Sequence, residues 1–240
     1  MQQFVEECCA WIKGKVREAG AEGVVVGMSG GLDSSVTAVL CKKALPKSTL
    51  GLIMPIQSSH VDTEHALLVS KRFDIDVRIL NLEKPFYEML TILENNENKI
   101  PIANLKSRLR MCVLYYYANR DNLLVAGTSN KSEIGVGYFT KYGDGASDIL
   151  PIGSLLKSEV RKLGEYLGIP EPILKKPPSS GLWPGHKDEE EMGITYTEID
   201  AYLSGEDVDE DSKKRIEDMM RRNRHKLESP YIFIPSASPI

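Results

Sequence analysis

The chain has 240 residues and a net charge of −4, with 30 basic and 34 acidic side chains. This length suits one α/β domain with a full core, so we expect a single domain over residues 1–240. The chain lacks the excess of basic residues that is typical of nucleic-acid-binding proteins, so nothing in its charge indicates such a function. No apolar run is long enough to span a membrane and the N-terminus lacks a signal-peptide layout, so we expect a cytoplasmic protein without membrane or nucleic-acid partners.

Apolar runs alternate with helical patterns through the first half of the chain. The pattern predicts helices over 2–19, from the first loop to about 44, and over 60–73, 86–93 and 102–118, with strands over 23–28, 50–55, 77–80 and 123–126. This alternation predicts an α/β fold with a doubly wound, mainly parallel sheet flanked by helices. Ligands bind such sheets at the carboxyl ends of the strands, so we expect Met54 and Ala126 to border one crevice.

The second half of the chain is less regular. Residues 135–148 are rich in glycine and hold tyrosines and charges without a sustained period, which is typical of a functional loop. Helices are expected over 155–167, 195–204 and 209–225. The irregular stretch 175–188 is our candidate for a mobile lid.

The four cysteines follow no spacing that is typical of a metal or redox site. Cys41 and Cys112 fall within apolar helical patterns, which predicts plain thiols in the core. In the helix over 102–118, Tyr116 belongs to the same apolar set as Cys112.

A loop rich in glycine and serine, at 29–35, follows the first strand and opens the next helix. Consecutive glycines let the backbone approach a ligand closely, and the start of a helix favours phosphate. Asp33 beside an anion site indicates a Mg²⁺–nucleotide complex, but the alternative is an ordinary turn in which Asp33 or Ser34 caps the helix. The loop matches neither G-x-x-x-x-G-K-[ST] nor G-x-G-x-x-G, so the usual nucleotide-binding fingerprints do not decide between these hypotheses.

A second polar loop, at 127–133, follows the fourth strand and enters a helix. Taken alone, it is best explained as a capping box, in which Ser129 or Asn130 caps the helix and Glu133 reaches back.

The first loop and the stretch that follows the second resemble parts of known enzymes. S-G-G-x-D-S in the first resembles the pyrophosphate-binding loop of the ATP pyrophosphatase family, whose members adenylate a substrate and release pyrophosphate. G-Y-F-T-K-Y-G-D-G, at 137–145, resembles the signature of NAD⁺ synthetases. The resemblance covers roughly residues 22–228, including L-G-I-P at 167–170, K-P-P-S at 176–179 and H-K at 225–226.

The resemblance implies the adenine nucleotide alpha hydrolase-like fold of the ATP pyrophosphatases and the activity of an ammonia-dependent NAD⁺ synthetase. Such a ligase amidates deamido-NAD⁺, with ATP as co-substrate and Mg²⁺ as cofactor, and releases AMP and pyrophosphate in the final step of NAD⁺ biosynthesis. Family members are homodimers, and we place the contact on the helices over 102–118 and 195–225. Glutamine-dependent members carry an additional amidase domain, for which 240 residues leave no room. We therefore expect direct use of ammonia, unless a separate glutaminase chain delivers it.

The resemblance also implies roles for individual residues. The ATP-binding positions are Gly27, Met28, Ser29, Gly30, Gly31, Leu32, Asp33, Ser34, Thr128, Lys157 and Ser179. The metal-binding positions are Asp33 and Glu133. The positions that bind deamido-NAD⁺ are Arg110, Lys141, Asp148, His225 and Lys226. The catalytic positions are Asp33 and Lys157. Because ammonium must lose a proton before it attacks, our own hypothesis adds Asp148 or Asp144 as the acid that helps it to do so.

Two other interpretations compete. The first is another ligase with the same loop, such as a GMP synthetase core or a tRNA-thiolating enzyme; the absence of C-x-x-C disfavours thiolation, and the stretch 137–145 disfavours both. The second is a non-catalytic nucleotide-binding module of related fold, which would have no use for Asp33, Glu133 and Lys157 together.

Overall fold

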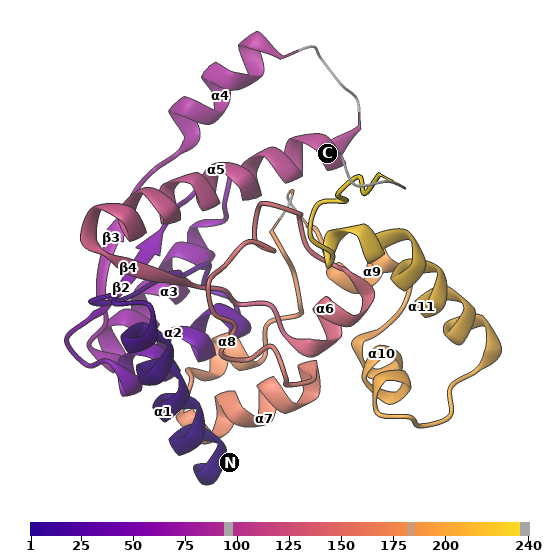
Figure 1. Cartoon of the computed structure of the whole chain (residues 1–240), viewed down its shortest axis with the longest axis horizontal. Coiled ribbons are helices and arrows are strands. Elements are labelled where there is room, and N and C mark those ends of the chain that lie inside the picture. Colours follow the sequence, from indigo (N-terminus) through magenta and orange to yellow (C-terminus); the bar gives the residue numbers. More distant parts are fainter. Residues whose placement is uncertain (94–97, 182, 184, 236–240) are drawn as a thin grey trace.

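A four-stranded parallel sheet organises the N-terminal half of the fold (Figure 1). The computed structural model describes residues 1–93, 98–181, 183 and 185–235. The strands are β1 (Gly23–Gly27), β2 (Thr49–Ile53), β3 (Asp76–Ile79) and β4 (Leu123–Ala126), in the spatial order β3-β2-β1-β4. Every pairing between them is parallel. The prediction of an α/β fold with a mainly parallel sheet is confirmed.

Helices follow or connect all of the strands. They are α1 (Gln2–Glu18), α2 (Leu32–Ala44), α3 (His60–Phe73), α4 (Glu83–Ile92), α5 (Lys99–Asp121), α6 (Lys131–Val136), α7 (Lys157–Leu167), α8 (Glu171–Leu174), α9 (Asp188–Met192), α10 (Tyr196–Leu203) and α11 (Glu210–Asn223), and a 3₁₀ turn spans Arg224–Lys226. The short helices α8 and α9 are not among the elements that the sequence pattern predicts. A single turn buries too few side chains to produce a helical period.

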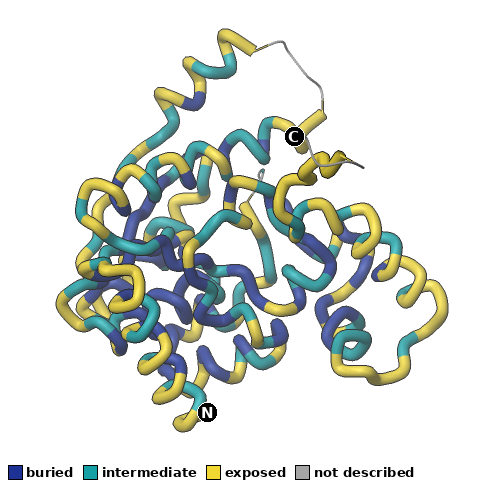
Figure 2. The backbone as a smooth tube through the Cα atoms, in the orientation of Figure 1, coloured by how far each residue is buried: buried dark blue, intermediate teal, exposed yellow. Residues whose placement is uncertain are grey.

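The strand order places a switch point between β1 and β4. The chain runs from β1 through β2 to β3 on one side and then returns to add β4 on the other side of β1. Figure 2 shows buried positions concentrated in the interior of the molecule and exposed ones along its outer helices. One apolar cluster packs α1, α2 and α7 against one face of the sheet, while a second packs α5 against the other face. The helix that follows β1 and the helix that precedes β4 therefore cover opposite faces of the sheet. Such an arrangement leaves a crevice at the carboxyl ends of β1 and β4.

The C-terminal helices form a smaller unit beside the sheet. A third apolar cluster joins α6 to α9, α10 and α11 through Val136, Met192, Ile199 and Ile216. Figure 1 shows these helices together on the side of the molecule away from β3. Helix α10 contacts both α6 and α7, so this unit reaches the segments that follow β4.

The buried face of α5 differs from the predicted one. Cys112 is exposed and Tyr116 is 61% exposed, whereas Leu114 and Tyr117 are buried. The prediction of a core thiol is therefore wrong for Cys112, and it is confirmed for Cys41, which is fully buried. Apolar residues occur nearly all round α5, so periodicity alone does not identify the face that the sheet covers.

Within the described part of the chain, no helix has the length and apolar character needed to cross a bilayer.

Candidate active site

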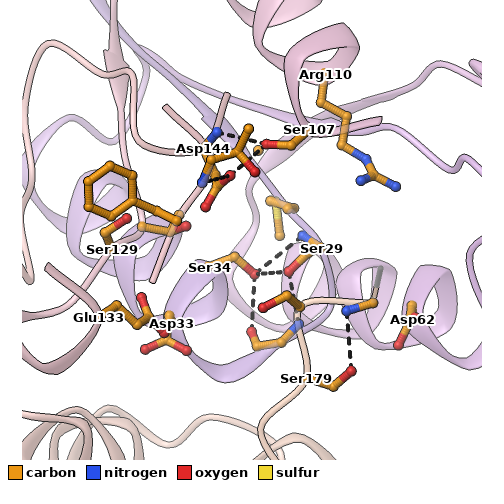
Figure 3. A pocket seen from close by; sticks show the side chains of 18 of the residues that line it. Ser29, Asp33, Ser34, Asp62, Ser107, Arg110, Ser129, Glu133, Asp144 and Ser179 are labelled. Carbon is orange, nitrogen blue, oxygen red and sulfur yellow. Dashed lines mark hydrogen bonds between the residues drawn. The ribbon is translucent and has the colours of Figure 1, made fainter. Parts of the chain in front are cut away.

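A cavity of about 380 Å³ opens at the carboxyl ends of β1, β2 and β4 (Figure 3). Its lining includes Met54 at the end of β2 and Ala126 at the end of β4. The predicted crevice is therefore present, and the loop at 29–35 borders it, as do parts of the segments 138–144 and 176–181.

The loop at 29–35 is held by its own hydroxyl groups. Ser34 Oγ lies 3.0 Å from Ser29 Oγ, accepts a hydrogen bond from the Ser29 backbone N–H and donates to the Gly31 carbonyl. Gly31 is the N-cap of α2 and no side chain caps the helix. The capping alternative for Asp33 and Ser34 is therefore wrong. A helix start without a side-chain cap keeps its N–H groups for an anionic ligand.

Close packing explains one glycine of this loop. Gly30 has a φ of +78°, and a Cβ built there would lie 2.1 Å from the backbone oxygen of Asp62 at the start of α3. The loop thus adopts a shape that only glycine allows at this position.

Three charged side chains from three helices meet at one end of the cavity. Lys157 Nζ lies 2.5 Å from Asp33 Oδ2 and 3.3 Å from Glu133 Oε1. Asn130 Nδ2 donates to the other Asp33 oxygen at 2.9 Å. The structure therefore brings together the three residues, Asp33, Glu133 and Lys157, for which the sequence predicts one catalytic and metal-binding group.

Glu133 has two structural roles at once. Asn130 Oδ1 accepts from the Glu133 N–H at 3.0 Å, and Glu133 Oε2 accepts from the Asn130 N–H at 3.2 Å, so the capping box is present. The second carboxylate oxygen of Glu133 faces Lys157. The capping interpretation and the active-site interpretation are compatible because the carboxylate uses a different oxygen for each.

Burial and mutual charge set the protonation of this group. Burial, with the nearby Asp33 carboxylate, raises the pKa of Glu133 to about 7, although Lys157 acts in the opposite direction. Burial alone would lower the pKa of Lys157, but the Asp33 and Glu133 carboxylates outweigh it and raise that pKa. The lysine therefore stays charged and neutralises part of the acidic pair.

The donor set fits Mg²⁺. The described residues contain no group of three or more His, Cys, Asp or Glu side chains arranged to hold a metal ion. Two carboxylates, from Asp33 and Glu133, converge on one cation, the Lys157 ammonium. Mg²⁺ is usually held by one or two carboxylates together with substrate phosphates and water, so a site with two carboxylates that is completed by a nucleotide suits this ion.

Polar side chains continue around the cavity. Thr128, Ser179 and Arg110 all contribute to its lining. Arg110 Nε donates to the Met54 carbonyl at 3.0 Å, which fixes the guanidinium at the end of β2. Burial lowers the pKa of Arg110, and the charges of Asp144 and Asp62 offset part of that effect.

The two candidate acids for ammonium lie in different surroundings. Asp144 lines the cavity, and its Oδ1 accepts from Ser107 Oγ at 2.6 Å and from the Thr140 N–H at 3.1 Å. Asp148 is absent from the lining; it accepts from the Val125 N–H at 2.7 Å and from the Tyr115 hydroxyl at 3.1 Å. Asp148 therefore connects β4 to α5 through hydrogen bonds, and of the two candidate acids only Asp144 lines the cavity.

Of the C-terminal pair His225 and Lys226, only the lysine lines the cavity. Lys226 lines the cavity, and its Nζ donates to the carbonyls of Gly137 at 2.8 Å and Phe139 at 3.0 Å. Lys141, His225 and Gly30 do not line the cavity. Lys141 Nζ donates to the His225 carbonyl, so these two residues join the functional loop to the C-terminal turn.

Several residues at the cavity were not assigned a role from the sequence. Lys176 and Asp62 both line the cavity and form an ion pair. Tyr138 donates to Glu191 at 2.6 Å, and the buried His186 lies 2.8 Å from the same carboxylate. Lys176 and Tyr138 belong to stretches that resemble NAD⁺ synthetases, so their place in those stretches is the signal that could have identified them.

Hydrogen bonds within the segment predicted as a lid, residues 175–188, join its two ends. Ser180 donates to Asp188 through both its N–H and its hydroxyl at 2.7 Å, and Ser179 Oγ donates to the His186 carbonyl at 2.6 Å. Residues 182 and 184 lie outside the described residues. Residues 176–181 and Asp188 of this segment line the cavity, and the mobility of the segment stays a prediction.

Comparison with known proteins agrees with this geometry. The chain matches the sequence model of the NAD synthase family over residues 4–230. The NH(3)-dependent NAD(+) synthetase of Methanocaldococcus jannaschii is 47% identical over 248 residues, with 96% of each chain covered. The enzyme of the same name from Carboxydothermus hydrogenoformans is 43% identical, with 96% of this chain and 97% of that protein covered. The solved structure of NMN synthetase from Francisella tularensis superposes with a TM-score of 0.93 at 38% identity and covers 98% of both chains. The chain belongs to the NAD synthase family.

Proposed function

We propose that this protein is an ammonia-dependent NAD⁺ synthetase, a ligase that amidates the nicotinate carboxyl group of deamido-NAD⁺ at the expense of ATP. The observation that carries the proposal is the convergence of Asp33, Glu133 and Lys157 beside an uncapped helix start within one cavity. That arrangement suits a magnesium triphosphate, and relatives of 43% and 47% identity carry the name of this activity.

The first step joins the substrate to the nucleotide. The nicotinate carboxylate attacks the α-phosphorus of ATP, the bond to the β-phosphate oxygen breaks, and pyrophosphate leaves an acyl adenylate behind. Both reactants are anionic, so the site must supply positive charge where negative charge gathers. The loop from Gly27 to Ser34 offers N–H groups and hydroxyls, Lys157 offers an ammonium, and Thr128 and Ser179 offer further hydroxyls. A Mg²⁺ ion held by Asp33 and Glu133 would neutralise phosphate oxygens.

The second step transfers nitrogen. Ammonia attacks the acyl carbon, the bond between that carbon and the bridging oxygen breaks, and AMP leaves with this oxygen and the electron pair of the broken bond. Ammonium must first lose a proton, and we assign its acceptance to Asp144, because this carboxylate lines the cavity whereas Asp148 does not. Arg110 and Lys226, at other points of the lining, would hold the dinucleotide, and Lys141 and His225 would support the C-terminal turn.

The nitrogen source gives a direct test. We expect the purified chain to form NAD⁺ from deamido-NAD⁺, MgATP and ammonium chloride, and to form none from glutamine. Pyrophosphate release that depends on deamido-NAD⁺ would distinguish the ligase from a nucleotide-binding module. Activity with glutamine alone would overturn the assignment to ammonia, and an absence of turnover with both nitrogen donors would overturn the proposed function.

A mononucleotide substrate is the second candidate. The superposed structure from Francisella tularensis is named an NMN synthetase, and the same two steps on nicotinate mononucleotide would give NMN. We expect a higher kcat/KM for deamido-NAD⁺, because both curated relatives described above are named for NAD⁺. Parallel assays of the two substrates decide, and a preference for the mononucleotide would change the substrate while keeping the chemistry.

We also propose a homodimer and a cytoplasmic location. Apolar side chains such as Ile100 and Tyr116 are 50% and 61% exposed on α5, the helix on which we place the contact. All four cysteines are free, which is typical of the reducing cytoplasm. Sedimentation at micromolar concentration tests the dimer, and a monomer with full activity would contradict it.

A further inference from the structure

Helix α10 presents two side chains toward Lys157. Tyr196 and Asp200 are four positions apart and therefore share one face of the helix. Both are almost fully buried, at 5% and 7% exposure. They belong to the C-terminal unit, whereas Lys157 opens α7.

Asp200 completes the start of α7. Leu156, the N-cap residue, has no polar side chain to offer, so the first N–H groups of α7 need acceptors from elsewhere. Asp200 Oδ2 accepts from the Ser158 N–H at 2.9 Å, and Asp200 Oδ1 accepts from the Ser132 hydroxyl. Ser132 Oγ in turn accepts from the Lys157 N–H at 2.9 Å. The backbone of Lys157 is thus fixed through a fully buried serine and a carboxylate from another helix.

Tyr196 acts at the other end of the same lysine. Its ring centroid lies 4.9 Å from Lys157 Nζ, within the range of a cation–π contact. Its hydroxyl donates to Glu133 Oε1 at 3.4 Å and to Asp188 Oδ2 at 3.3 Å. The ammonium therefore has two carboxylates and one aromatic face around it, and the aromatic face comes from α10.

We propose that Asp200 and Tyr196 are positioning residues for Lys157, so that the C-terminal helices complete the active site although they contribute none of the three converging charges. Asp200 sets the backbone of the lysine and Tyr196 limits where its ammonium can lie. This inference rests on the proposed function, in which Lys157 neutralises the phosphates of ATP.

Asp200→Asn is the most informative substitution because it preserves shape. The carboxylate accepts two hydrogen bonds with two oxygens, whereas an amide has one oxygen and one NH₂ group. If the amide oxygen accepts from the Ser158 N–H, the NH₂ group faces Ser132 Oγ, and the Ser132 hydroxyl loses its acceptor. The substitution thus loosens the start of α7 without creating a cavity.

The test is a double-mutant cycle between Asp200→Asn and Lys157→Gln. In the otherwise native protein we expect Asp200→Asn to lower kcat for NAD⁺ formation roughly tenfold, with KM for deamido-NAD⁺ nearly unchanged, because a charge-assisted hydrogen bond that places the lysine is lost. In the Lys157→Gln background the same change should alter kcat by no more than about twofold. The affinity for α,β-methylene-ATP with Mg²⁺, measured by calorimetry in all four proteins, should show the same coupling even where turnover is too slow to measure.

Asp209→Asn is the matched control. Asp209 caps α11 in the same unit by accepting from the N–H groups of Asp211 and Ser212 at 3.1 and 3.0 Å, and it does not line the cavity. It should lower stability with kcat and analogue affinity unchanged. Tyr196→Phe, which keeps the ring, should retain more analogue affinity than Tyr196→Leu.

The outcomes separate the two proposals. Equal effects of Asp200→Asn in both Lys157 backgrounds, on kcat or on analogue affinity, would overturn the positioning role. A native protein that binds the analogue but forms no NAD⁺ would overturn the proposed function, while the binding cycle would still decide the positioning role.

Discussion

The ammonium of Lys157 lies 2.5 Å from the carboxylate of Asp33, although the two residues come from different helices, α7 and α2. Their side chains are only 10% and 17% exposed, and Glu133 adds a second carboxylate at 3.3 Å. The protein thus supplies its own cation to the two groups that would hold Mg²⁺. Removal of one partner from a buried ion pair is costly because the other charge stays buried and unpaired.

Lys157→Met should therefore destabilise the protein more than it would at the surface. We expect the free energy of unfolding in urea without Mg²⁺ to fall by about 3 kcal/mol, and added MgCl₂ to restore more stability to this variant than to the native protein. Lys175→Met is the control, because the Lys175–Glu171 pair is 76% and 71% exposed and should contribute about 0.5 kcal/mol or less. Equal losses in the two variants would contradict the buried pair.

Glu133 should make stability depend on pH in an unusual direction. Burial raises the pKa of its carboxyl from 4.5 to about 7. Between pH 4.5 and 7 this carboxyl is therefore protonated in the folded protein but ionised in the unfolded chain. This contribution is complete below about pH 4.5 and is lost as the pH rises through about 7. Urea unfolding at pH 5 to 8 without Mg²⁺ should show that native stability declines relative to Glu133→Gln across this window. Glu165 is exposed, so the free energy of unfolding of Glu165→Gln should follow that of the native protein across this pH range. A difference in unfolding free energy between the native protein and Glu133→Gln that does not change with pH would refute the raised pKa.

Gly30 and Gly31, in the loop at 29–35, should respond differently to substitution by alanine. At Gly30, with a φ of +78°, the new Cβ would meet the Asp62 carbonyl oxygen at 2.1 Å. We expect Gly30→Ala to cost about 2 kcal/mol or more of stability, since strain and a backbone clash combine, and to weaken binding of α,β-methylene-ATP. Gly31→Ala meets only Ser29 Oγ, at 3.4 Å, and should be tolerated. Similar affinities for both variants would argue against the packed geometry of the loop.

Asp144 and Asp148 should separate catalysis from stability. Asp144→Asn should lower ammonia-dependent kcat about a hundredfold with little change in the denaturation midpoint, because the cavity acid would be lost. Asp148→Asn should keep most of kcat but lose about 1–2 kcal/mol of stability, because Val125 and Tyr115 lose a charged acceptor. The pair is measured by steady-state kinetics at saturating MgATP and by urea unfolding. A larger loss of kcat in Asp148→Asn would return the proton-accepting role to Asp148.

Local patterns were sufficient for the sheet and for the residues that meet at its carboxyl edge. Alternating apolar runs predict the four strands, and the rule for strand ends places Met54 and Ala126 at one cavity. The S-G-G-x-D-S loop and the stretch at 137–145 lead to the family that the comparisons show. These features are local or depend on the general geometry of parallel sheets, so sequence is enough to predict them.

The predictions that failed, or that left two residues open, concern the surroundings of a side chain, which depend on how the helices pack. Cys112 lies in an apolar pattern yet is exposed. Helix α5 has apolar residues on more than one face, and the sheet covers the face of Leu114 and Tyr117, not that of Cys112. Asp144 and Asp148 are equivalent in sequence, and only the hydrogen bonds of Asp148 to β4 and α5 distinguish them.

By itself the sequence determined the parallel sheet, the glycine- and serine-rich loop that follows its first strand, and the family, because strand patterns and short motifs depend on neighbours along the chain. Only the tertiary structure decided which acid faces the cavity, which face of α5 is buried, and that α10 holds Lys157 through Asp200 and Tyr196. Those relationships join residues far apart in the chain. Their existence depends on how helices pack around the sheet, which no local pattern encodes.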